Sequence, residues 1–483
     1  MKTLAMNEQD SATDTVSEVV ARAREAQVIW RELSIGERAR SLRRLARRAL
    51  QDEELGQTIT EDSGKALFEA IGFEVAYLCE LTRYLTARRA RKALAESRRP
   101  SFIFPHKRAR VRWLPRGVVL IIGPSNFPLL NNFADAVGPL LAGNSVVLKP
   151  SPRTPKTSRR ILTLWRDCGL PKDVFQVVEG GDDTARALVD TCDGIFFTGS
   201  VAVGREVSAR AGARLVPCVT ELGGKSAMIV LADADLPAAA RAAAWGAFAG
   251  AGQVCIRTER ALVEESVAEA FCRLVVEETR KIRQGSGADR DIGPVATDAQ
   301  VEHCRALIAE AVGRGARIAC GGSSAEGNQR LFAPTVLDAV SPQARVANEE
   351  TFGPVLPILR VKDAEEALAL ANASHLGLSG SIWSGDGRRA LALARRLQCG
   401  SVCINDVLAN YFLVAAPLGG WKASGVGFRH GSETLRQFCV PQSVVEDRPG
   451  MGLVGGVVRR NLAFPYRNSV LKLLRRLLKV FYR

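Results

Sequence analysis

Three residues of this sequence have side chains suited to chemistry at a carbonyl group. Cys255 follows a run of mostly small residues, Glu221 stands before two glycines, and Asn126 lies between Pro124 and Pro128. A thiol can attack a carbonyl carbon, a carboxylate can move protons, and an amide can donate a hydrogen bond to the oxyanion that forms. The set therefore suits covalent catalysis by a cysteine.

Each of these residues also has a structural interpretation that the sequence leaves open. A single cysteine among eleven is usually an inert core residue, Glu221 could cap a helix, and Asn126 could belong to a turn. Glu350 has a similar alternative, because it follows Glu349 and could be one of two surface carboxylates. The Gly-Gln-Val-Cys setting of Cys255 favours the chemical interpretation for the thiol.

Two predicted strands end in residues that could bind phosphate or ribose. Gly199 and Ser200, followed by Gly204, stand at a strand-to-helix turn, where glycine lets a phosphate approach the backbone N–H groups. Lys149, with Ser151 after it, ends another strand and offers a cation. Because the pattern is not GxGxxG, we expect a dinucleotide that is bound in an atypical way.

Composition and charge exclude several classes of protein. The 483 residues are 47% hydrophobic and 24% charged, which is ordinary for a globular chain of two or three domains. The net charge is +15, but zinc-finger spacings and RNA-binding signatures are absent, so no nucleic-acid partner is expected. Eleven cysteines without repeating spacing, and without histidines placed to complete a metal site, indicate a reducing cytoplasm and no metal.

The segments that must position these residues alternate between strand and helix. Residues 14–98 are predicted to be helical, with a capping box at Ser34 and Glu37. After them, short apolar strands and helices alternate in two cycles, which indicates two parallel, doubly wound α/β sheets that bind ligands beyond the carboxyl ends of their strands. Cys255 would then lie in the cleft between the two units. The expected strands cover residues 117–123, 145–149, 175–178, 194–197, 216–220, 226–231, 259–264, 331–338, 355–360, 379–384 and 400–405.

Two regions stand apart from this alternation. Apolar residues at alternate positions between Phe102 and Trp113 predict strands of a small separate sheet. Residues 448–467 are rich in glycine and arginine and are expected to form a linker.

The last segment, residues 468–483, is predicted to be a basic amphipathic helix. Leu474 and Leu478 fall on its apolar face, and Lys472 and Arg476 fall on its basic face. The helix is too short to span a bilayer. Its apolar face could dock on the enzyme's own body or on a partner subunit, or it could make peripheral contact with a membrane.

Taken together, these stretches resemble the aldehyde dehydrogenase superfamily from the N-terminal helices to about residue 445. The resemblance implies that Cys255 is the nucleophile, Glu221 the general base and Asn126 a donor of the oxyanion hole. It also implies NAD or NADP as cofactor, with Glu350 on the nicotinamide ribose and Phe352 against the nicotinamide. The implied cofactor-binding residues are Lys149, Ser151, Gly199, Ser200, Gly204, Leu222, Glu350 and Phe352.

The same resemblance implies a division of the chain. Residues 1–100 and 116–222 would form the dinucleotide-binding domain, and residues 223–435 the catalytic domain. Residues 101–115 and 436–447 would form the oligomerisation strands of a homodimer or homotetramer, and residues 448–483 the basic amphipathic tail.

The implied reaction is the NAD(P)-dependent oxidation of an aldehyde to the carboxylic acid through a thiohemiacetal and a thioester on Cys255. Two alternatives are a CoA-acylating dehydrogenase and a non-catalytic interaction protein that keeps the fold. Glu221 argues against the first, because a route in which a thiol replaces water needs no water-activating base. The joint presence of all the implied site residues argues against the second, because a decayed site would lose one of them.

Two positions depart from the family's pattern. Ser125 stands where the family usually has tryptophan, so the wall beside Asn126 is smaller and more polar. Pro152 stands where a glutamate often binds the adenine ribose hydroxyls, and Arg153 and Lys156 follow it. Loss of that carboxylate removes its repulsion of a 2′-phosphate, so we expect NADP to be tolerated alongside NAD.

The expected substrate is an apolar aliphatic or aromatic aldehyde. The alternative is succinate semialdehyde, since related bacterial sequences with a similar C-terminal motif resemble such enzymes. Asp135 stands where many relatives are basic, so Arg257 would have to hold the substrate carboxylate. The residues expected to line an apolar tunnel are Phe127, Leu130, Ile256 and the run Tyr411, Phe412 and Leu413.

Overall fold

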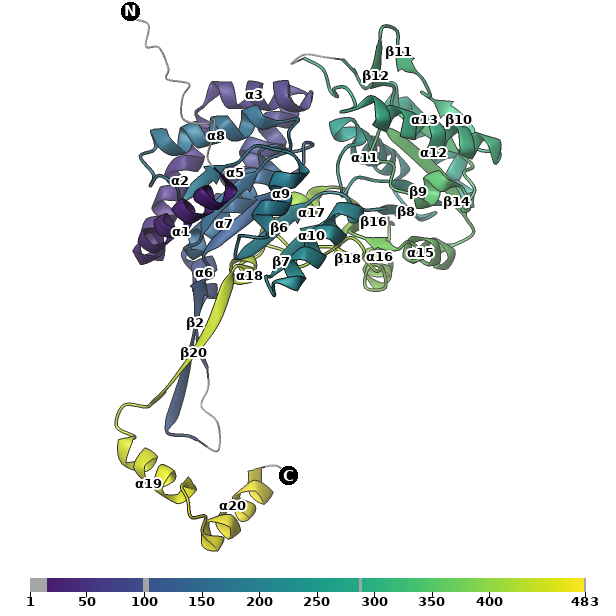
Figure 1. Ribbon diagram of the computed structural model, residues 1–483. Helices are drawn as coiled ribbons and strands as arrows, with labels where there is room; N and C mark the ends of the chain where they lie inside the picture. Colours follow the sequence, from purple (N-terminus) through teal and green to yellow (C-terminus); the bar gives the residue numbers. More distant parts are fainter. Residues whose placement is uncertain (1–14, 99–103, 286–288, 482–483) are drawn as a thin grey trace, which may run out of the picture.

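The computed structural model describes residues 15–98, 104–285 and 289–481. Within these residues, a six-stranded and a seven-stranded sheet form the two halves of the body, and a three-stranded sheet extends from it as an arm (Figure 1). Each large sheet is parallel except for one antiparallel edge strand. The predicted α/β fold with two Rossmann-like sheets is confirmed.

A helical layer precedes the first large sheet, as predicted, but the prediction is wrong at its end, where residues 95–98 form the strand β1 (Ala95–Arg98). The capping box is present, because the Ser34 hydroxyl accepts the Glu37 N–H at 3.3 Å and the Glu37 carboxylate accepts the Ser34 N–H at 2.8 Å. Trp30 is fully buried and donates its indole N–H to the Leu140 carbonyl oxygen at 2.8 Å. The layer consists of α1 (Val16–Glu32), α2 (Ile35–Leu50), α3 (Glu53–Ser63), α4 (Leu67–Glu69), the π-helix η1 (Ala70–Val75), α5 (Ala76–Leu85), α6 (Arg88–Arg91) and the 3₁₀-helix η2 (Lys92–Leu94).

The six-stranded sheet has the order β19-β7-β6-β3-β4-β5. The order reverses between β3 and β6, and sheets of this type bind ligands at the carboxyl ends of the strands beside such a reversal. Its strands are β3 (Val118–Ile122), β4 (Ser145–Lys149), β5 (Phe175–Val177), β6 (Gly194–Thr198), β7 (Cys218–Glu221) and β19 (Gly425–Val426). The helices between them are η3 (Leu130–Ala134), α7 (Asp135–Ala142), α8 (Pro155–Asp167), α9 (Asp182–Val189) and α10 (Val201–Ala213).

The seven-stranded sheet has the order β10-β13-β14-β9-β8-β16-β17. Its strands are β8 (Ala227–Val230), β9 (Arg260–Glu264), β10 (Arg317–Cys320), β13 (Thr335–Asp338), β14 (Val355–Val361), β16 (Ser379–Trp383) and β17 (Ser401–Ile404). Its helices are α11 (Leu236–Phe248), η4 (Ala249–Gly252), α12 (Glu265–Thr279), α13 (Asp298–Gly313), α14 (Arg345–Asn348), α15 (Ala364–Asn372), α16 (Gly387–Ala394) and α17 (Ala409–Phe412).

One expected strand of this half is wrong. Residues 331–338 form parts of two strands, because Pro334 interrupts them and has no N–H to donate to a ladder. The first, β12 (Asn328–Phe332), pairs with β11 (Ser324–Ala325) in a separate hairpin, and only β13 joins the large sheet. Two short strands, β15 (Leu376–Gly377) and β18 (Trp421–Lys422), also pair outside it.

The arm contains the small separate sheet that the sequence predicts. Strand β2 (Lys107–Pro115) pairs antiparallel with β20 (Cys439–Asp447) along its whole length, and β1 (Ala95–Arg98) pairs with the other edge of β2. Residues 99–103, which include the predicted Phe102, lie outside the described residues. Short helix α18 (Thr434–Gln437) precedes β20, which leads away from the body (Figure 1).

The tail beyond the arm consists of two helices, α19 (Gly452–Leu462) and α20 (Asn468–Phe481). The expected linker at 448–467 is therefore wrong over most of its length. The glycines of this segment suggested a flexible linker, but Gly455 lies in a helix and allows close packing. A Cβ on Gly455 would lie 3.0 Å from His106 and 3.1 Å from Asp447. Arg459 adds an ion pair with Asp447 at 2.8 Å.

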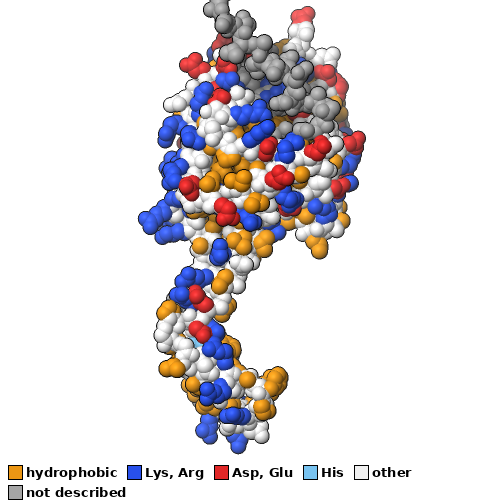
Figure 2. All heavy atoms as spheres, turned by 60° about the vertical axis from the view of Figure 1, so that its left-hand side comes forward, with side chains coloured by type: hydrophobic (Ala, Val, Ile, Leu, Met, Phe, Trp, Pro, Cys, Tyr) orange, Lys and Arg blue, Asp and Glu red, His pale blue; other side chains and the backbone are white. Residues whose placement is uncertain are grey.

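Helix α20 begins at the predicted residue and is described as far as Phe481, but it does not dock on the enzyme's own body. It lies beyond the end of the arm, away from both large sheets (Figure 1). In the surface view, basic and hydrophobic side chains gather together over this end of the molecule (Figure 2). No helix in the described part of the chain is both long and apolar enough to cross a membrane.

Candidate active site

Most of the predicted site residues lie at one edge of the six-stranded sheet. Lys149 ends β4 and Glu221 ends β7, while Asn126 follows β3 and Gly199 follows β6. The register pairs Ile122 with Lys149, and Thr198 with Glu221, so these strands end level with one another. Parallel strands bring their carboxyl ends to the same side, which is why residues distant in sequence meet here.

Cys255 lies on a loop that two glycines allow to pack tightly. A Cβ on Gly252, which has φ +72°, would lie 2.3 Å from the Gly353 carbonyl oxygen. A Cβ on Gly224 would lie 2.7 Å from the carbonyl oxygen of Cys255 itself. Because only glycine permits both approaches, the thiol loop is held between the turn that follows Glu221 and the turn that carries Glu350.

The amide of Asn126 is attached to the thiol loop. Its Nδ2 donates to the carbonyl oxygen of Gln253 at 2.8 Å, two residues before Cys255. The backbone carbonyl oxygen of Asn126 accepts a hydrogen bond from Lys65 Nζ at 2.8 Å, whereas its side-chain Oδ1 has no hydrogen-bond partner. Asn126 faces a polar groove that it shares with Ser125 and Gln253 and that lies apart from the apolar pocket described below.

A buried ion pair from the N-terminal layer holds the segment after Asn126. Lys65 Nζ lies 2.5 Å from the Glu74 carboxylate, and both side chains are almost fully buried. The other oxygen of Glu74 accepts the N–H groups of Leu129 and Leu130 at 2.7 and 3.1 Å. Sequence reasoning missed this pair, because lysine and glutamate on predicted helices are usually solvated.

Glu221 is a buried carboxylate with few hydrogen-bond or ion-pair partners. Its side chain is 4% exposed, and its Oε1 atom has no hydrogen-bond partner. The nearest recorded cation is Arg429, whose Nε lies 3.9 Å from Oε2. Burial raises the pKa of Glu221 to about 8, although the Arg429 charge opposes the rise. Such a carboxylate can accept a proton near neutral pH.

The Cys255 thiol is half-buried and is not ionised by its surroundings alone. Burial raises its pKa to about 12, against the opposing field of Arg429. Because the thiolate is the nucleophilic form, reaction requires that a base remove this proton.

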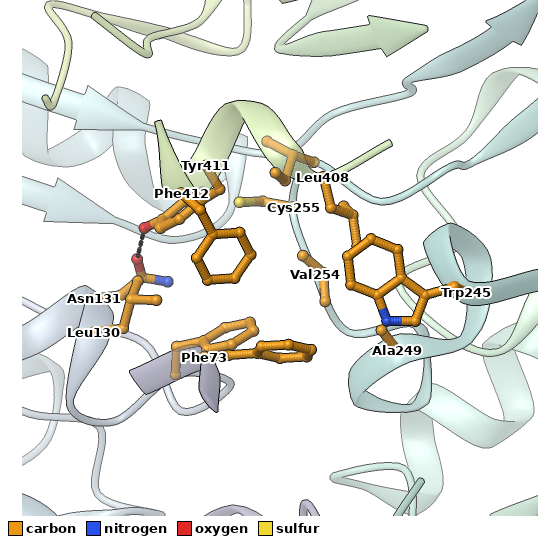
Figure 3. Close-up of a pocket in the computed structure, with 12 residues that line it drawn as sticks. Phe73, Leu130, Asn131, Trp245, Ala249, Val254, Cys255, Leu408, Tyr411 and Phe412 are labelled. Atoms are coloured by element: carbon orange, nitrogen blue, oxygen red, sulfur yellow. Dashed lines mark hydrogen bonds between the residues drawn. The ribbon is translucent and has the colours of Figure 1, made fainter. Parts of the chain in front are cut away.

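The sulfur of Cys255 opens into an apolar pocket with aromatic walls (Figure 3). Five of the residues expected from the sequence to line the tunnel lie in its wall: Phe127, Leu130, Ile256, Tyr411 and Phe412. Sequence reasoning missed Phe73 and Trp245, which come from η1 and α11 and face the Phe412 ring across the pocket (Figure 3). The ring centroid of Phe73 lies 5.7 Å from that of Phe412 and 6.2 Å from that of Trp245.

Two expectations about the pocket are wrong. Arg257 cannot hold a substrate carboxylate, because it is fully buried and its guanidinium binds Glu259 at 2.6 Å and two backbone carbonyl oxygens. Leu413 is 63% exposed and is not in the wall. A side chain two residues from Cys255 in sequence therefore points into the core rather than the pocket.

The residues expected to hold the nucleotide offer groups that suit an anion and a close backbone approach. Ser200 caps the N-terminus of α10, where free N–H groups favour an anion. Gly204 lets α10 pack closely on the sheet, since a Cβ there would lie 2.4 Å from the Leu222 side chain. Lys149 is mostly buried, and its ammonium makes no ion pair with any described residue. Ser151 accepts the N–H of Arg153 at 3.3 Å.

The turn that carries Glu350 is held by the buried carboxylate of Glu259, which accepts backbone N–H groups of this turn. Glu350 accepts the Gly224 N–H at 2.9 Å, and burial raises its pKa to about 7. Phe352, at φ +46°, donates its N–H to Glu259 at 3.1 Å. Although burial opposes ionisation, Arg257 and Lys225 hold the pKa of Glu259 well below its usual range. A helix N-terminus, a lysine without an ion pair among the described residues and a buried carboxylate are groups whose chemistry suits the phosphates and ribose of a dinucleotide.

The chain belongs to the aldehyde dehydrogenase family, whose model matches residues 2–444. The helical tail lies outside that match. The family assignment makes the protein an NAD(P)-dependent aldehyde dehydrogenase, as the sequence predicts.

Individual relatives differ in substrate and cofactor. The chain is 38% identical to a 4,4'-diapolycopene aldehyde oxidase of Methylomonas sp, over 90% of this chain and 82% of that protein. It is 35% identical to a protein of Mycolicibacterium smegmatis provisionally named as an NADP(+)-dependent succinate-semialdehyde dehydrogenase, over 95% of this chain and 90% of that one. A solved NAD-dependent aldehyde dehydrogenase from Sinorhizobium meliloti matches with a TM-score of 0.85 and 35% identity, over 90% and 88% of the two chains.

The Lys65–Glu74 pair predicts a large stability effect. Lys65→Met leaves the Glu74 charge buried without its cation, so the free energy of unfolding should fall by about 3–5 kcal/mol in chemical denaturation. The matched control is Lys281→Met, which breaks an exposed pair with Glu278 and should cost about 0–1 kcal/mol. Equal losses for the two variants would contradict the role given to the buried pair.

Proposed function

We propose that this enzyme oxidises apolar aliphatic or aromatic aldehydes to the free acids, with Cys255 as nucleophile, Glu221 as general base and Asn126 as oxyanion donor. The observation that carries the proposal is a thiol that opens into an aromatic pocket, on a loop packed against the turn after a buried carboxylate of pKa about 8. In this proposal the six-stranded sheet with the N-terminal helices is the dinucleotide-binding unit, and the seven-stranded sheet carries the catalytic loop.

The residues divide the reaction between them. Cys255, once deprotonated, attacks the aldehyde carbon, and the Asn126 amide together with the Cys255 N–H stabilises the oxyanion. Lys149, Ser200 and Glu350 would hold NAD or NADP, which would supply the acceptor for the hydride. A thioester on Cys255 remains. Glu221 then takes a proton from water, which attacks the thioester and releases the acid.

The pocket favours an apolar substrate over succinate semialdehyde. Its walls hold rings of Phe73, Trp245 and Phe412, and no lysine or arginine is among the residues that line it. A buried, unpaired carboxylate of the substrate would be costly there. Arg257, which was expected to supply a cation, is bound to Glu259. The name of the Methylomonas relative, which refers to an aldehyde of diapolycopene, agrees with an apolar substrate.

Water, rather than coenzyme A, is the proposed acceptor of the acyl group. A CoA-acylating enzyme needs no base for water, whereas Glu221 is buried beside the thiol loop with a pKa suited to that task. A non-catalytic protein would gain nothing from a buried carboxylate that costs stability.

The arm is the proposed oligomerisation element of a homodimer or homotetramer. Strand β20 pairs with β2 on one side only, so its other edge is available for pairing in the described chain. Six of its nine residues are exposed. An exposed edge of this length is a natural site for pairing with a second copy.

We also propose that the tail places the enzyme on the cytoplasmic face of an anionic membrane. Residues 448–483 contain nine lysines and arginines and no aspartate or glutamate. In α20 the apolar side chains Leu473 and Val480 are 58% and 71% exposed. A helix with exposed apolar residues among basic ones suits the boundary between lipid headgroups and acyl chains, and each basic residue adds about 1 kcal/mol of attraction. An apolar aldehyde dissolved in that membrane would lie close to the enzyme.

The base assignment predicts a specific pH dependence. Because Glu221 acts when ionised and its pKa is about 8, kcat should rise with pH through that value. Glu221→Gln should lower kcat by roughly 10²–10⁴-fold and remove this rise. The measurement is NAD(P)H absorbance with an aromatic aldehyde across pH, with Cys255→Ser as the inactive control. An unchanged profile in Glu221→Gln would refute the assignment.

The absence of a carboxylate at Pro152 predicts use of both cofactors. Wild-type kcat/KM for NADP should be within about a thousandfold (about 4 kcal/mol) of that for NAD, and Pro152→Glu should lower the NADP value selectively, because its charge repels a 2′-phosphate. Pro171→Glu, at an exposed proline before the amino end of β5, is the matched control. A wild-type preference for NAD larger than this would end the hypothesis.

The membrane proposal predicts binding that depends on the charge of α20. The full chain should sediment with vesicles of phosphatidylglycerol and phosphatidylcholine, and not with phosphatidylcholine alone. Replacing Lys472, Arg475, Arg476 and Lys479 with glutamine should abolish the binding. The matched control replaces the exposed residues Arg40, Arg43, Arg44 and Arg47 of α2. Equal binding by both variants, or a change only in oligomeric state, would overturn the proposal and favour docking on a partner subunit.

A further inference from the structure

Behind the catalytic carboxylate lies a buried arginine that the proposed mechanism does not use. Arg429 follows β19 and is 4% exposed. Its Nη1 donates to Asn131 Oδ1 and to the Tyr411 hydroxyl, both at 2.6 Å, and its Nη2 donates to Thr198 Oγ1 at 3.0 Å. These bonds fix the guanidinium plane at the carboxyl end of β6, directly beside the end of β7.

Two buried carboxylates face this one guanidinium. Glu221 Oε2 lies 3.9 Å from Nε, and Asp135 Oδ2 lies 3.5 Å from Nη1. Neither distance is a hydrogen bond, and Nε, Glu221 Oε1 and Asp135 Oδ2 all lack hydrogen-bond partners. Three unsatisfied polar atoms that are buried around one cation are costly, which indicates that their arrangement serves the chemistry rather than stability.

The other titratable groups around Glu221 are neutral in this setting. Burial raises the pKa values of Tyr77 and Tyr411 far above neutrality, and burial together with Arg429 lowers the pKa of His430 to about 3. The Cys255 thiol is protonated before it reacts. Burial is the largest influence against charge at Glu221; of the neighbouring charges, Arg429 favours its ionisation and Asp135 on α7 opposes it.

We propose that Arg429 and Asp135 are positioning residues that act in opposite directions on the charge of the general base Glu221. Arg429 stabilises ionised Glu221 through its charge, while Asp135, which faces the same guanidinium, opposes its ionisation. The balance keeps Glu221 able both to accept the proton of the attacking water and to release it afterwards. The inference rests on the proposed role of Glu221.

Removing each partner should shift the pH profile of kcat in opposite directions. Arg429→Met should move the rise in kcat to higher pH by about one unit or more, because the base loses its nearby opposite charge. Asp135→Asn should move it to lower pH, because a like charge is removed. Arg429→Lys, which keeps the charge, should restore a profile near that of the wild type.

Controls separate this inference from a structural effect and from failure of the base assignment. Arg260→Met removes another buried arginine, one that binds three backbone carbonyl oxygens, and should lower the melting temperature without moving the profile. If Glu221→Gln leaves the pH dependence intact, the base assignment fails. If Glu221→Gln removes it while Arg429→Met and Asp135→Asn shift it in the same direction or not at all, only the present inference is overturned. Comparing Arg429→Lys with Arg429→Met decides the matter even if Arg260→Met does not fold.

Discussion

The structure depends on the cost of burying charge where two sheets meet. Burial opposes the charge of a carboxylate, yet a carboxylate that is to act as a base must stay close enough to ionisation to work. Glu221 is buried with an unsatisfied oxygen, and its pKa of about 8 is the direct result. The neighbouring ion pairs limit the free-energy cost of burying these charges. Glu221 lies 3.9 Å from Arg429, and the other buried carboxylates, Glu74 and Glu259, are fully paired.

Those paired carboxylates explain how the site keeps its geometry. Glu74, with Lys65, holds the segment that follows Asn126, and Glu259 holds the turn that carries Glu350. Neither touches the pocket beside Cys255. Buried carboxylates thus have two uses in this enzyme. The paired carboxylates Glu74 and Glu259 fix the loops, and the unpaired carboxylate Glu221 is the proposed reactive group.

Sequence patterns predicted the parts that depend on local order. The strand end at Lys149 followed from a short apolar run, and the strand expected over 216–220 ends one residue later, at Glu221; the capping box at Ser34 followed from its spacing. The direction of single side chains did not follow, since Arg257 turns into the core within two residues of Cys255. Contacts between helices distant in sequence could not be predicted either. Phe73 lines the pocket because α11 and α17 pack near it, and no local pattern indicates that packing. Helix α19 was missed because its glycines suggested a linker.

Mass spectrometry of enzyme quenched during turnover tests the central claim most directly. Peptides from enzyme mixed with an aromatic aldehyde and NAD should carry the acyl group on Cys255, one of eleven cysteines, all of them free in the structure. The label should form only when NAD is present and should disappear as the substrate is consumed. Turnover without an acyl group on Cys255, or with the group on another cysteine, would contradict the account.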